Sequence, residues 1–304
     1  RPPHVAAAED EHHGTEQYHR DTEDGSPRTC GGHTDAFYGG CEGSGDAAIE
    51  RTKHRGTENP DMHTVRFRDP AGSIRTGEWH GDSVSFAGET YDLDAVDVLA
   101  PSDPTKIVCI GRNYADHAAE MDNEIPDRPL LFLKPPNAVA GHGDTVTLPA
   151  GKERIDHEAE MAVVVGEQAR NVDADDAMEY VAGFTCLNDL SNRDDQRQET
   201  NWVRGKAFDN AAPMGPVLAS PDEVPADAEI QLRVNGETRQ SSSRDHLAFS
   251  VPDLVEEITT YLTLEPGDVI ATGTPAGVGP LEDGDTVEVE LEGVGVLEHD
   301  VRIP

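Results

Sequence analysis

The sequence predicts an α+β fold that is rich in strands, and two observations lead to this class. Short apolar and β-branched runs outnumber amphipathic helical segments along the chain. The two kinds of segment do not alternate strictly, as they would in a doubly wound α/β protein. With 304 residues and no internal repeat, the chain has material for one large domain or two modest ones.

The ordered part of the chain is expected to begin at Met62. From there the patterning becomes that of a folded protein, and Gly72 and Gly81 mark turns between strands. The elements expected are short strands over 63–95, a strand over 106–111, a helix over 114–122 and an extended segment over 129–135.

The second half is predicted mainly from turn and cap signals. Asn235-Gly236 indicates a hairpin turn, Asp173 is an expected N-cap, and Pro252 suits the first turn of a helix. The elements expected are a buried strand over 161–165, a helix around 173–181, a strand over 183–189, a hairpin over 230–240, a helix over 250–262 and three C-terminal strands.

The charge of the chain excludes one class of partner. Asp and Glu number 60 against 24 Lys and Arg, so the net charge is −36 and binding to nucleic acid is not expected. Such an acid excess, with Arg preferred to Lys, is typical of proteins from salt-accumulating halophilic archaea. The chain has no membrane-spanning apolar stretch and no signal-peptide pattern, so we expect a cytoplasmic protein. Cys109 and Cys186 lie in apolar runs and are interpreted as buried thiols.

Residues 1–61 differ from the rest of the chain. They contain no Leu, one Val and one Ile, and cannot bury enough apolar surface to offset the entropy of ordering. A metal-binding tail built on Cys30, His33 and Cys41 is the functional alternative, but the spacing matches no zinc motif. We expect this segment to be disordered, or to be upstream sequence preceding a true start at Met62.

Two glutamates, Glu158 and Glu160, directly precede the buried strand, and Asp189 follows the next apolar strand. Residues i and i+2 of a strand share a face, so both Glu side chains are predicted to point to one side. Like charges at the edge of a core repel each other and lose hydration unless a cation lies between them. Three carboxylates without a Cys pattern suit Mg²⁺ or Mn²⁺, although solvated edge charges explain most such patterns. His157 would face the other way and is excluded as a ligand.

Two further clusters suit acid–base chemistry. His117 and Glu120 share a face of the predicted helix, where a carboxylate can orient an imidazole and raise its basicity. Lys206 is one of only five lysines, and an ammonium beside a metal can stabilise an enolate. A surface helical pair and a surface lysine are the plainer alternatives. The glycine-rich stretch 271–280 lacks the order of a P-loop, so no nucleotide site is expected.

Taken in order, these motifs resemble the fumarylacetoacetate hydrolase superfamily over about residues 106–304, and residues 62–105 are similar to its smaller N-terminal part. The segments that carry the resemblance are KIVCIGRNYADHAAEM, LFLKPPNAVAGHGD, HEAEMAVVVG, GFTCLNDLSNRDDQ, GKAFDNAAPMGP, LRVNGETRQ and LEPGDVIATGTPAGVGPLEDGD. The resemblance implies a β-rich roll of the family's C-terminal domain type with a small N-terminal subdomain. It also implies a homodimer with one Mg²⁺ or Mn²⁺ per subunit.

The resemblance further implies roles for ten residues. The metal ligands would be Glu158, Glu160 and Asp189. The catalytic groups would be His117, Glu120, Gln196 and Lys206, and the substrate-binding groups would be Arg112, Arg193 and Thr274. Three positions depart from the family's pattern and leave substrate preference open, namely His157, Asp195 and Ala207.

The branch resembled most contains acylpyruvate hydrolases, oxaloacetate decarboxylases and 2-hydroxyhepta-2,4-diene-1,7-dioate isomerases. It implies that His117, oriented by Glu120, activates a water, and that pyruvate leaves as a metal-bound enolate near Lys206. We therefore expect C–C hydrolysis of acylpyruvate-like 2-oxo acids, or decarboxylation of oxaloacetate. The alternatives are the isomerase, a dehydratase of 2-keto-3-deoxy sugar acids, and a non-catalytic metal-stabilised dimer, since one such site can serve several reactions.

Overall fold

The computed structural model describes residues 63–116 and 125–304. By its contacts the chain divides into two units, Arg1–His54 and Arg55–Pro304, and every described residue belongs to the second. The predictions made for residues 1–61, and most of the helix predicted over 114–122, therefore lie outside the described residues.

The largest sheet contains twelve strands, and its central strands lead to the pocket described below. Its main path runs through β4 (Glu89–Asp92), β3 (Ser83–Phe86), β2 (Ile74–Trp79), β1 (His63–Arg68), β14 (Ala212–Ala219), β12 (Val181–Asn188), β11 (Ala159–Val165), β17 (Val269–Ala271), β6 (Ile107–Gly111) and β7 (Leu130–Lys134). β5 (Asp97–Leu99) pairs with β1, and β8 (Val139–Ala140) pairs with β14. Neighbouring strands are antiparallel except at β17–β6 and β14–β8.

Two smaller sheets complete the strands of the described region. The five-stranded sheet has the order β16 (Glu237–Ser243), β15 (Glu229–Val234), β19 (Thr286–Leu291), β20 (Gly295–Arg302) and β9 (Thr145–Thr147). The three-stranded sheet has the order β13 (Ser191–Asn192), β10 (Ile155–His157) and β18 (Gly279–Pro280). Only β20 and β9 pair in parallel within these two sheets.

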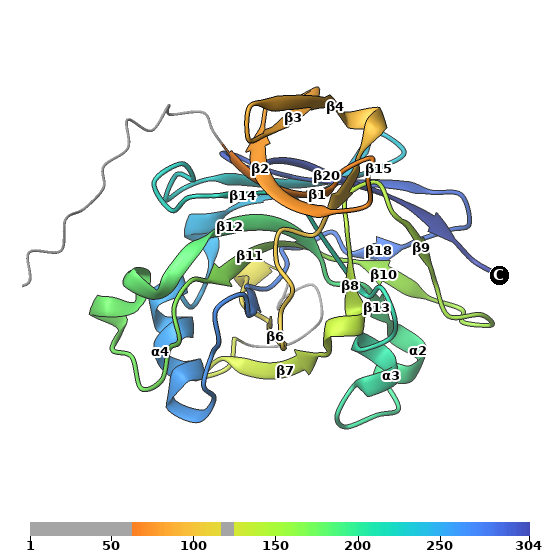
Figure 1. Cartoon of the computed structure of the whole chain (residues 1–304). Coiled ribbons are helices and arrows are strands. Elements are labelled where there is room, and N and C mark those ends of the chain that lie inside the picture. The colour runs from red at the N-terminus through yellow and green to blue at the C-terminus, as the bar shows by residue number, and fades with distance from the viewer. Residues whose placement is uncertain (1–62, 117–124) are drawn as a thin grey trace, which may run out of the picture. The chain divides into compact units, whose positions relative to one another are not determined.

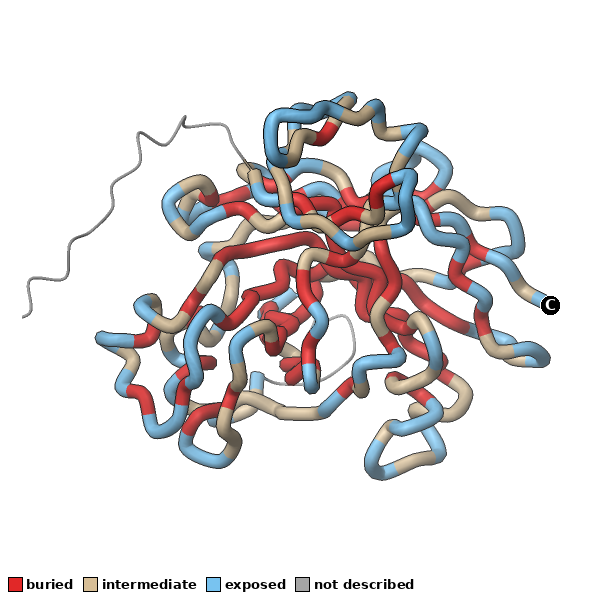
Figure 2. The backbone as a smooth tube through the Cα atoms, in the orientation of Figure 1, coloured by how far each residue is buried: buried red, intermediate tan, exposed pale blue. Residues whose placement is uncertain are grey.

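The hydrophobic core lies where the large sheet meets the five-stranded sheet. β14 packs against β20, β12 against β19, and β11 against β15 (Figure 1). Every residue of β11 is buried, as expected for a central strand covered on both faces, whereas β19 has an alternating pattern with one face buried. Figure 2 shows the buried residues concentrated along these central strands and the exposed ones on the outer turns.

Helices are short and few in the described region. The longest is α4 (Val251–Tyr261), which starts with a capping box between Ser250 and Asp253 and packs its apolar face against η3 (Ala174–Tyr180). The others are α2 (Arg193–Gln196), α3 (Val203–Lys206), η1 (Leu93–Ala95), η2 (Pro136–Ala138) and η4 (Arg244–His246). No helix among the described residues is long and apolar enough to cross a membrane.

The structure has the predicted strand-rich α+β fold, and the predicted strands, hairpin and C-terminal helix appear where expected. In the hairpin, Asn235 and Gly236 both adopt positive φ, as a two-residue turn requires. The helix around 173–181 is present as η3 with Asp173 at its N-cap position, although it is a 3₁₀ helix and the Asp173 side chain makes no capping hydrogen bond. One detail was missed: residues 97–99 lie outside the strands expected over 63–95 and 106–111, yet they form β5 by pairing with β1.

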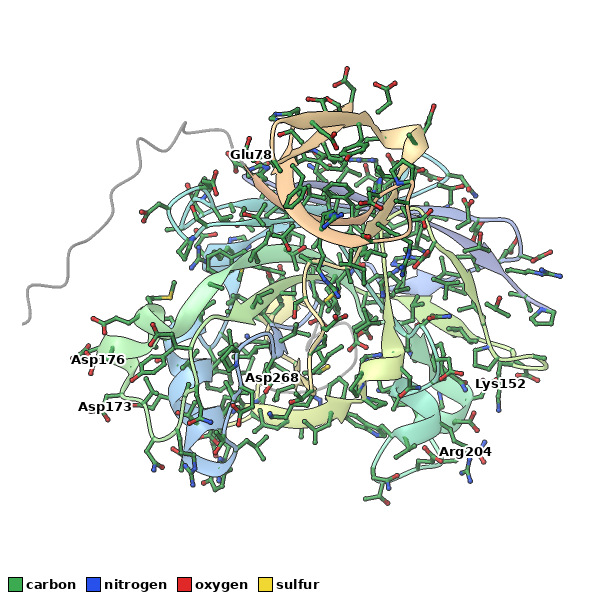
Figure 3. All side chains as sticks on the ribbon, viewed as in Figure 1. Glu78, Lys152, Asp173, Asp176, Arg204 and Asp268 are labelled. Atoms are coloured by element: carbon green, nitrogen blue, oxygen red, sulfur yellow. The ribbon has the colours of Figure 1, made fainter. Side chains whose placement is uncertain are left out.

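The acidic excess is visible on the outside of the described region. Glu78, Asp173 and Asp176 are exposed, and Figure 3 shows them projecting outward. Repulsion among such charges is screened by salt, so the stability of this protein should depend on ionic strength. A halophilic source remains a prediction.

Candidate active site

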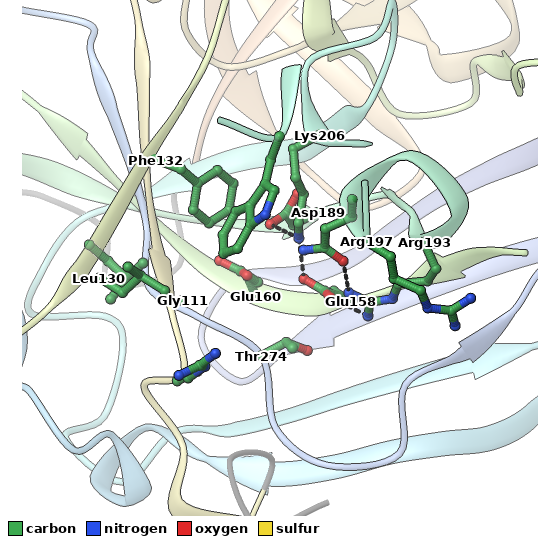
Figure 4. Close-up of a pocket in the computed structure, with 14 residues that line it drawn as sticks. Gly111, Leu130, Phe132, Glu158, Glu160, Asp189, Arg193, Arg197, Lys206 and Thr274 are labelled. Atoms are coloured by element: carbon green, nitrogen blue, oxygen red, sulfur yellow. Dashed lines mark hydrogen bonds and ion pairs between the residues drawn. The ribbon is translucent and has the colours of Figure 1, made fainter. Parts of the chain in front are cut away.

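A pocket of about 200 Å³ lies at the ends of the central strands. Its walls come from β6, β7, β11, α2 and α3 and from the segments that follow β12 and β17 (Figure 4). The residues that line it are Ile110, Gly111, Arg112, Leu130, Phe132, Glu158, Glu160, Asp189, Arg193, Gln196, Arg197, Trp202, Lys206 and Thr274.

Three carboxylates meet in this pocket. Glu158, Glu160 and Asp189 are all buried, and each offers a ligand oxygen within 4.8 Å of the others. Strand pairing brings them together, because Ala159 of β11 faces Asn188 of β12, which places Glu158 and Asp189 side by side at the strand ends. Glu158 lies between β10 and β11 rather than inside one strand, yet its side chain still joins that of Glu160.

Two cations hold Glu158. Lys206 Nζ donates to Glu158 Oε2 at 2.7 Å and to Asp189 Oδ2 at 2.6 Å, and Figure 4 shows the ammonium reaching between them. Burial lowers the pKa of Lys206, but the Asp189 and Glu158 carboxylates outweigh it, so the net pKa is raised and Lys206 stays charged. Arg193 donates to Glu158 Oε1 at 2.6 Å and to Asp156 Oδ2 at 2.8 Å. Its guanidinium is therefore occupied by protein groups, which indicates a positioning role.

Lys134 is a buried cation behind Asp189 that the sequence analysis did not select. Its Nζ lies 2.6 Å from Asp189 Oδ1, with neither side chain exposed by more than 1%. The ammonium donates its hydrogens to the carbonyls of Leu190, Lys206 and Ala211. Lys134 and Asp189 therefore form a buried ion pair rather than a hydrogen bond, because the hydrogens of the ammonium point to the three carbonyls. Asp189 Oδ1 is buried and accepts no hydrogen bond.

Glu160 has a different environment from Glu158. It accepts a hydrogen bond from the backbone of Gly273 at 2.8 Å and forms no ion pair with a described residue. Burial, together with the neighbouring Asp189 and Glu158 charges, raises the pKa of Glu160 well above its usual value. Position 273 requires glycine, because its φ is +99° and an added Cβ would lie 2.8 Å from Asn113 Cβ.

This donor set fits a divalent cation. Glu160 is a buried carboxylate that has no ion-pair partner among the described residues, and its charge requires compensation when it is ionised. Hard oxygen ligands are those that Mg²⁺ and Mn²⁺ prefer. Glu158, Glu160 and Asp189 are therefore the residues that would hold the ion.

The rest of the pocket is divided into a polar and an apolar side. Gln196 accepts from Arg193 through Oε1 at 2.8 Å, so its amide N–H₂ is left to donate elsewhere. Phe132 and Trp202 form an edge-to-face pair with centroids 5.4 Å apart, and Lys206 Nζ lies 5.1 Å from the Phe132 centroid. Arg112 and Trp202 both have positive φ, 61° and 55°, which is uncommon for such residues.

The structure brings together all the predicted site residues that it describes. Glu158, Glu160, Asp189, Arg112, Arg193, Gln196, Lys206 and Thr274 line one pocket. His117 and Glu120 lie outside the described residues. Sequence reasoning missed Lys134, Phe132, Arg197 and Trp202. For Lys134 a signal existed, because it is one of only five lysines and ends an apolar strand.

Comparison with known proteins identifies the family. A model of the fumarylacetoacetate (FAA) hydrolase C-terminal domain matches residues 106–302. The chain belongs to the fumarylacetoacetate hydrolase family. The region matched contains every strand and loop that lines the pocket, so the site described above is that of a fumarylacetoacetate hydrolase family domain.

Relatives within this family have different names. The chain is 40% identical over 225 residues to oxaloacetate tautomerase YisK of Bacillus subtilis, covering 69% of this chain and 75% of YisK. A 5-carboxymethyl-2-hydroxymuconate delta-isomerase structure from Mycobacterium smegmatis is 39% identical, with a TM-score of 0.73, covering 80% and 99% of the chains. Fumarylpyruvate hydrolase of Pseudomonas aeruginosa, solved with Mn²⁺ and pyruvate, is 32% identical, with a TM-score of 0.63, covering 72% and 93%.

Proposed function

We propose that this protein is a divalent-metal-dependent enzyme that interconverts the enol and keto forms of a small 2-oxo dicarboxylic acid, with oxaloacetate as the first substrate to test. The observation that carries the proposal is the buried triad of Glu158, Glu160 and Asp189 beside the charged Lys206. Such a site suits a reaction in which negative charge develops on a carbonyl oxygen.

The chemistry is divided between the ion and the chain. A bound Mg²⁺ or Mn²⁺ would polarise the 2-oxo carbonyl and so acidify the adjacent carbon. The Lys206 ammonium, fixed by two carboxylates, stabilises the negative charge of an enolate without having to reorganise. Gln196 offers its amide hydrogens from the same wall, because Arg193 already occupies its oxygen.

Tautomerisation moves a proton between the carbon next to the 2-oxo group and the carbonyl oxygen. A histidine oriented by a carboxylate can accept the proton from one position and return it to the other. We assign this step to His117 and Glu120. No water is consumed and no carbon–carbon bond breaks, so the reaction needs only this pair and an environment that stabilises the enolate.

Two arginines at the pocket favour a second carboxylate on the substrate. Arg112 and Arg197 line the pocket, and neither side chain forms a hydrogen bond or ion pair with another described residue. This is unusual here, because nearly every other described arginine contacts a carboxylate or a carbonyl. Guanidinium groups bind carboxylates well, and a cationic rim would help a dianion approach a chain of net charge −36.

Relatives support the choice of reaction. The tautomerase relative acts on oxaloacetate by its name, and the Mycobacterium smegmatis structure is named as an isomerase of an unsaturated carboxylic acid. Both names describe movement of a proton without hydrolysis. On this support we propose enol–keto interconversion ahead of the hydrolysis expected from the sequence.

The decisive experiment follows the ultraviolet absorbance of enol oxaloacetate with the full chain. It is done with Mg²⁺, with Mn²⁺ and with EDTA, at low and at molar KCl, and pyruvate is measured in parallel. We expect a metal-dependent decay of the enol to keto oxaloacetate without pyruvate. A decay rate equal to the uncatalysed rate with both metals at both salt concentrations would overturn the proposal.

The second candidate is hydrolysis of acylpyruvates or decarboxylation of oxaloacetate. It is favoured by the similarity to fumarylpyruvate hydrolase, whose structure contains Mn²⁺ and pyruvate. The candidates are separated by measuring pyruvate from oxaloacetate and from acetylpyruvate against a control with metal but no protein, because pyruvate formed above that control indicates C–C cleavage by the protein. For hydrolysis, His117 would take a proton from water rather than from carbon. Decarboxylation would release CO₂ and needs no attacking water.

A further inference from the structure

Gln240 is a buried side chain that joins three parts of the site without lining the pocket. It lies on β16, is 1% exposed, and uses both ends of its amide. Its Oε1 accepts from the backbone N–H of Ala159 at 2.9 Å and lies 3.1 Å from His157 Nδ1. Its Nε2 donates to Thr274 Oγ1 and to the carbonyl of Pro275, each at 2.8 Å.

Two backbone groups fix the orientation of this amide. The N–H of Ala159 can only donate and the carbonyl of Pro275 can only accept. The oxygen of Gln240 must therefore face Ala159, and its N–H₂ must face Pro275 and Thr274. A flipped amide would place two donors together at one end and two acceptors together at the other, in a buried environment where unmade hydrogen bonds are costly.

This orientation determines what the Thr274 hydroxyl can do. Because Gln240 donates to Thr274 Oγ1, the hydroxyl hydrogen has to point elsewhere. Thr274 lines the pocket, is 3% exposed, and donates to no other described residue. The hydroxyl is thus left as a donor without an acceptor among the described residues, at the wall of the pocket.

We propose that Gln240 is a positioning residue that makes Thr274 a hydrogen-bond donor to an anionic oxygen of the bound 2-oxo acid. The proposal rests on the proposed function, because the anion is the substrate's carboxylate or enolate oxygen. The same amide also binds Ala159, which lies between Glu158 and Glu160. Gln240 therefore fixes the Thr274 donor relative to the strand that carries two of the acids.

The test is a double-mutant cycle with Gln240→Glu and Thr274→Val. Glutamate keeps the length of the side chain and the acceptor for Ala159, but replaces the donating N–H₂ with an accepting oxygen. Thr274 would then donate to residue 240 and be lost to the ligand. The probe is oxalate, an analogue of the enolate, titrated calorimetrically in the presence of Mg²⁺, with KM and kcat for enol oxaloacetate measured separately.

We expect each single variant to weaken oxalate binding by about tenfold or more, the value of one hydrogen bond to a charged group. KM should rise more than kcat falls. In the Thr274→Val background, Gln240→Glu should have no further effect, because there is no hydroxyl left to orient. Equal losses in both backgrounds would show a merely structural role and overturn the proposal.

Two controls keep the test interpretable. If Gln240→Glu does not fold, Gln240→Met removes the same donor without adding charge, and the same loss of additivity with Thr274→Val is expected. Gln231→Glu, on the neighbouring strand β15, should leave oxalate affinity unchanged.

A wild-type protein that binds oxalate but does not tautomerise oxaloacetate would contradict the proposed function while leaving the cycle valid. A wild-type protein that binds no oxalate would overturn both.

Discussion

The floor and the rim of the pocket differ in how their charges are paired. At the floor, Glu158 contacts Lys206 and Arg193, and Asp189 contacts Lys206 and Lys134. At the rim, Arg112 and Arg197 form no such contact with a described residue. Paired buried charges hold a fixed geometry, whereas unpaired cations at an opening are available to a ligand.

The comparison separates groups that build the site from groups that select what enters it. Glu160 is the exception at the floor, since among the described residues its carboxylate accepts a hydrogen bond only from a backbone N–H and has no cation partner. A divalent cation would therefore compensate the charge of Glu160 more than that of Glu158 or Asp189.

The largest effect is expected from Lys134→Met, which keeps the volume of the side chain but removes its charge. Asp189 would keep Lys206 but lose the cation behind it, and breaking a buried pair costs about 3–5 kcal/mol of unfolding free energy. Lys152→Met, which breaks the more exposed pair with Asp195, should cost at most about 1 kcal/mol. Urea unfolding of both variants checks this, and similar midpoints would show that the floor pairing is not structural.

Glu160→Gln should preserve the fold and remove the site's affinity for metal. The neutral amide keeps an acceptor for Gly273 but supplies no charge to a cation. We expect Mn²⁺ affinity and metal-dependent activity to fall by more than about 100-fold, which exceeds the usual effect of residues that only orient a metal ligand. Calorimetric titration with Mn²⁺ measures this, and an affinity within a few-fold of wild type would exclude Glu160 as a ligand.

The sequence predicted the floor better than the rim, for a physical reason. Glu158, Glu160 and Asp189 stand directly at strand ends, so a period of two and one antiparallel pairing suffice to bring them together. Arg197 follows α2 and Trp202 precedes α3, two short helices whose position depends on tertiary contacts, so no periodicity identifies these residues. Lys134 carried a signal in the sequence, but its target, Asp189, lies 55 positions away and became evident only in the folded sheet.

The elements of the fold divide in the same way, into those determined by local sequence and those determined by tertiary contacts. Strands with strong patterning and the capped helix at Ser250 were predicted, because local chemistry determines them. β5 was not, because its three residues are held in place by pairing with β1. The bond between Gln240 and Thr274 joins segments 34 residues apart, and no local pattern in the sequence indicates it.

Mild acid should destabilise the protein through His299. Burial lowers the pKa of His299 to about 4, and its Nε2 lies 2.9 Å from the Asn188 amide nitrogen, which can donate only to the neutral ring. The unfolded chain binds a proton near pH 6.5, so stability from this residue is present above that value and is lost as pH falls toward 4. We expect a loss of about 2 kcal/mol between pH 7 and pH 5.

Denaturant midpoints at several pH values test this expectation with a matched pair of variants. His299→Gln cannot titrate but can still accept from Asn188, so between pH 7 and pH 5 it should lose about 2 kcal/mol less stability than wild type. The exposed His246, changed to Gln, should keep the pH dependence of the wild type. If His299→Gln loses as much stability as wild type, another group causes the acid sensitivity.

The smallest effect is expected at the rim, from Arg197→Gln. The side chain is exposed and has no partner among the described residues, so its loss should leave the unfolding free energy within about 0.5 kcal/mol of wild type. If it binds the distal carboxylate, KM for oxaloacetate should rise by about tenfold, while a 2-oxo acid with a methyl group in that position should be affected much less. Arg302→Gln, another exposed arginine without a described partner but remote from the pocket lining, is the matched control. The comparison is between two substrates of the same variant, so a defect of the metal site would impair the activity on both substrates equally. An equal increase in KM for both substrates would show that Arg197 does not select the distal carboxylate.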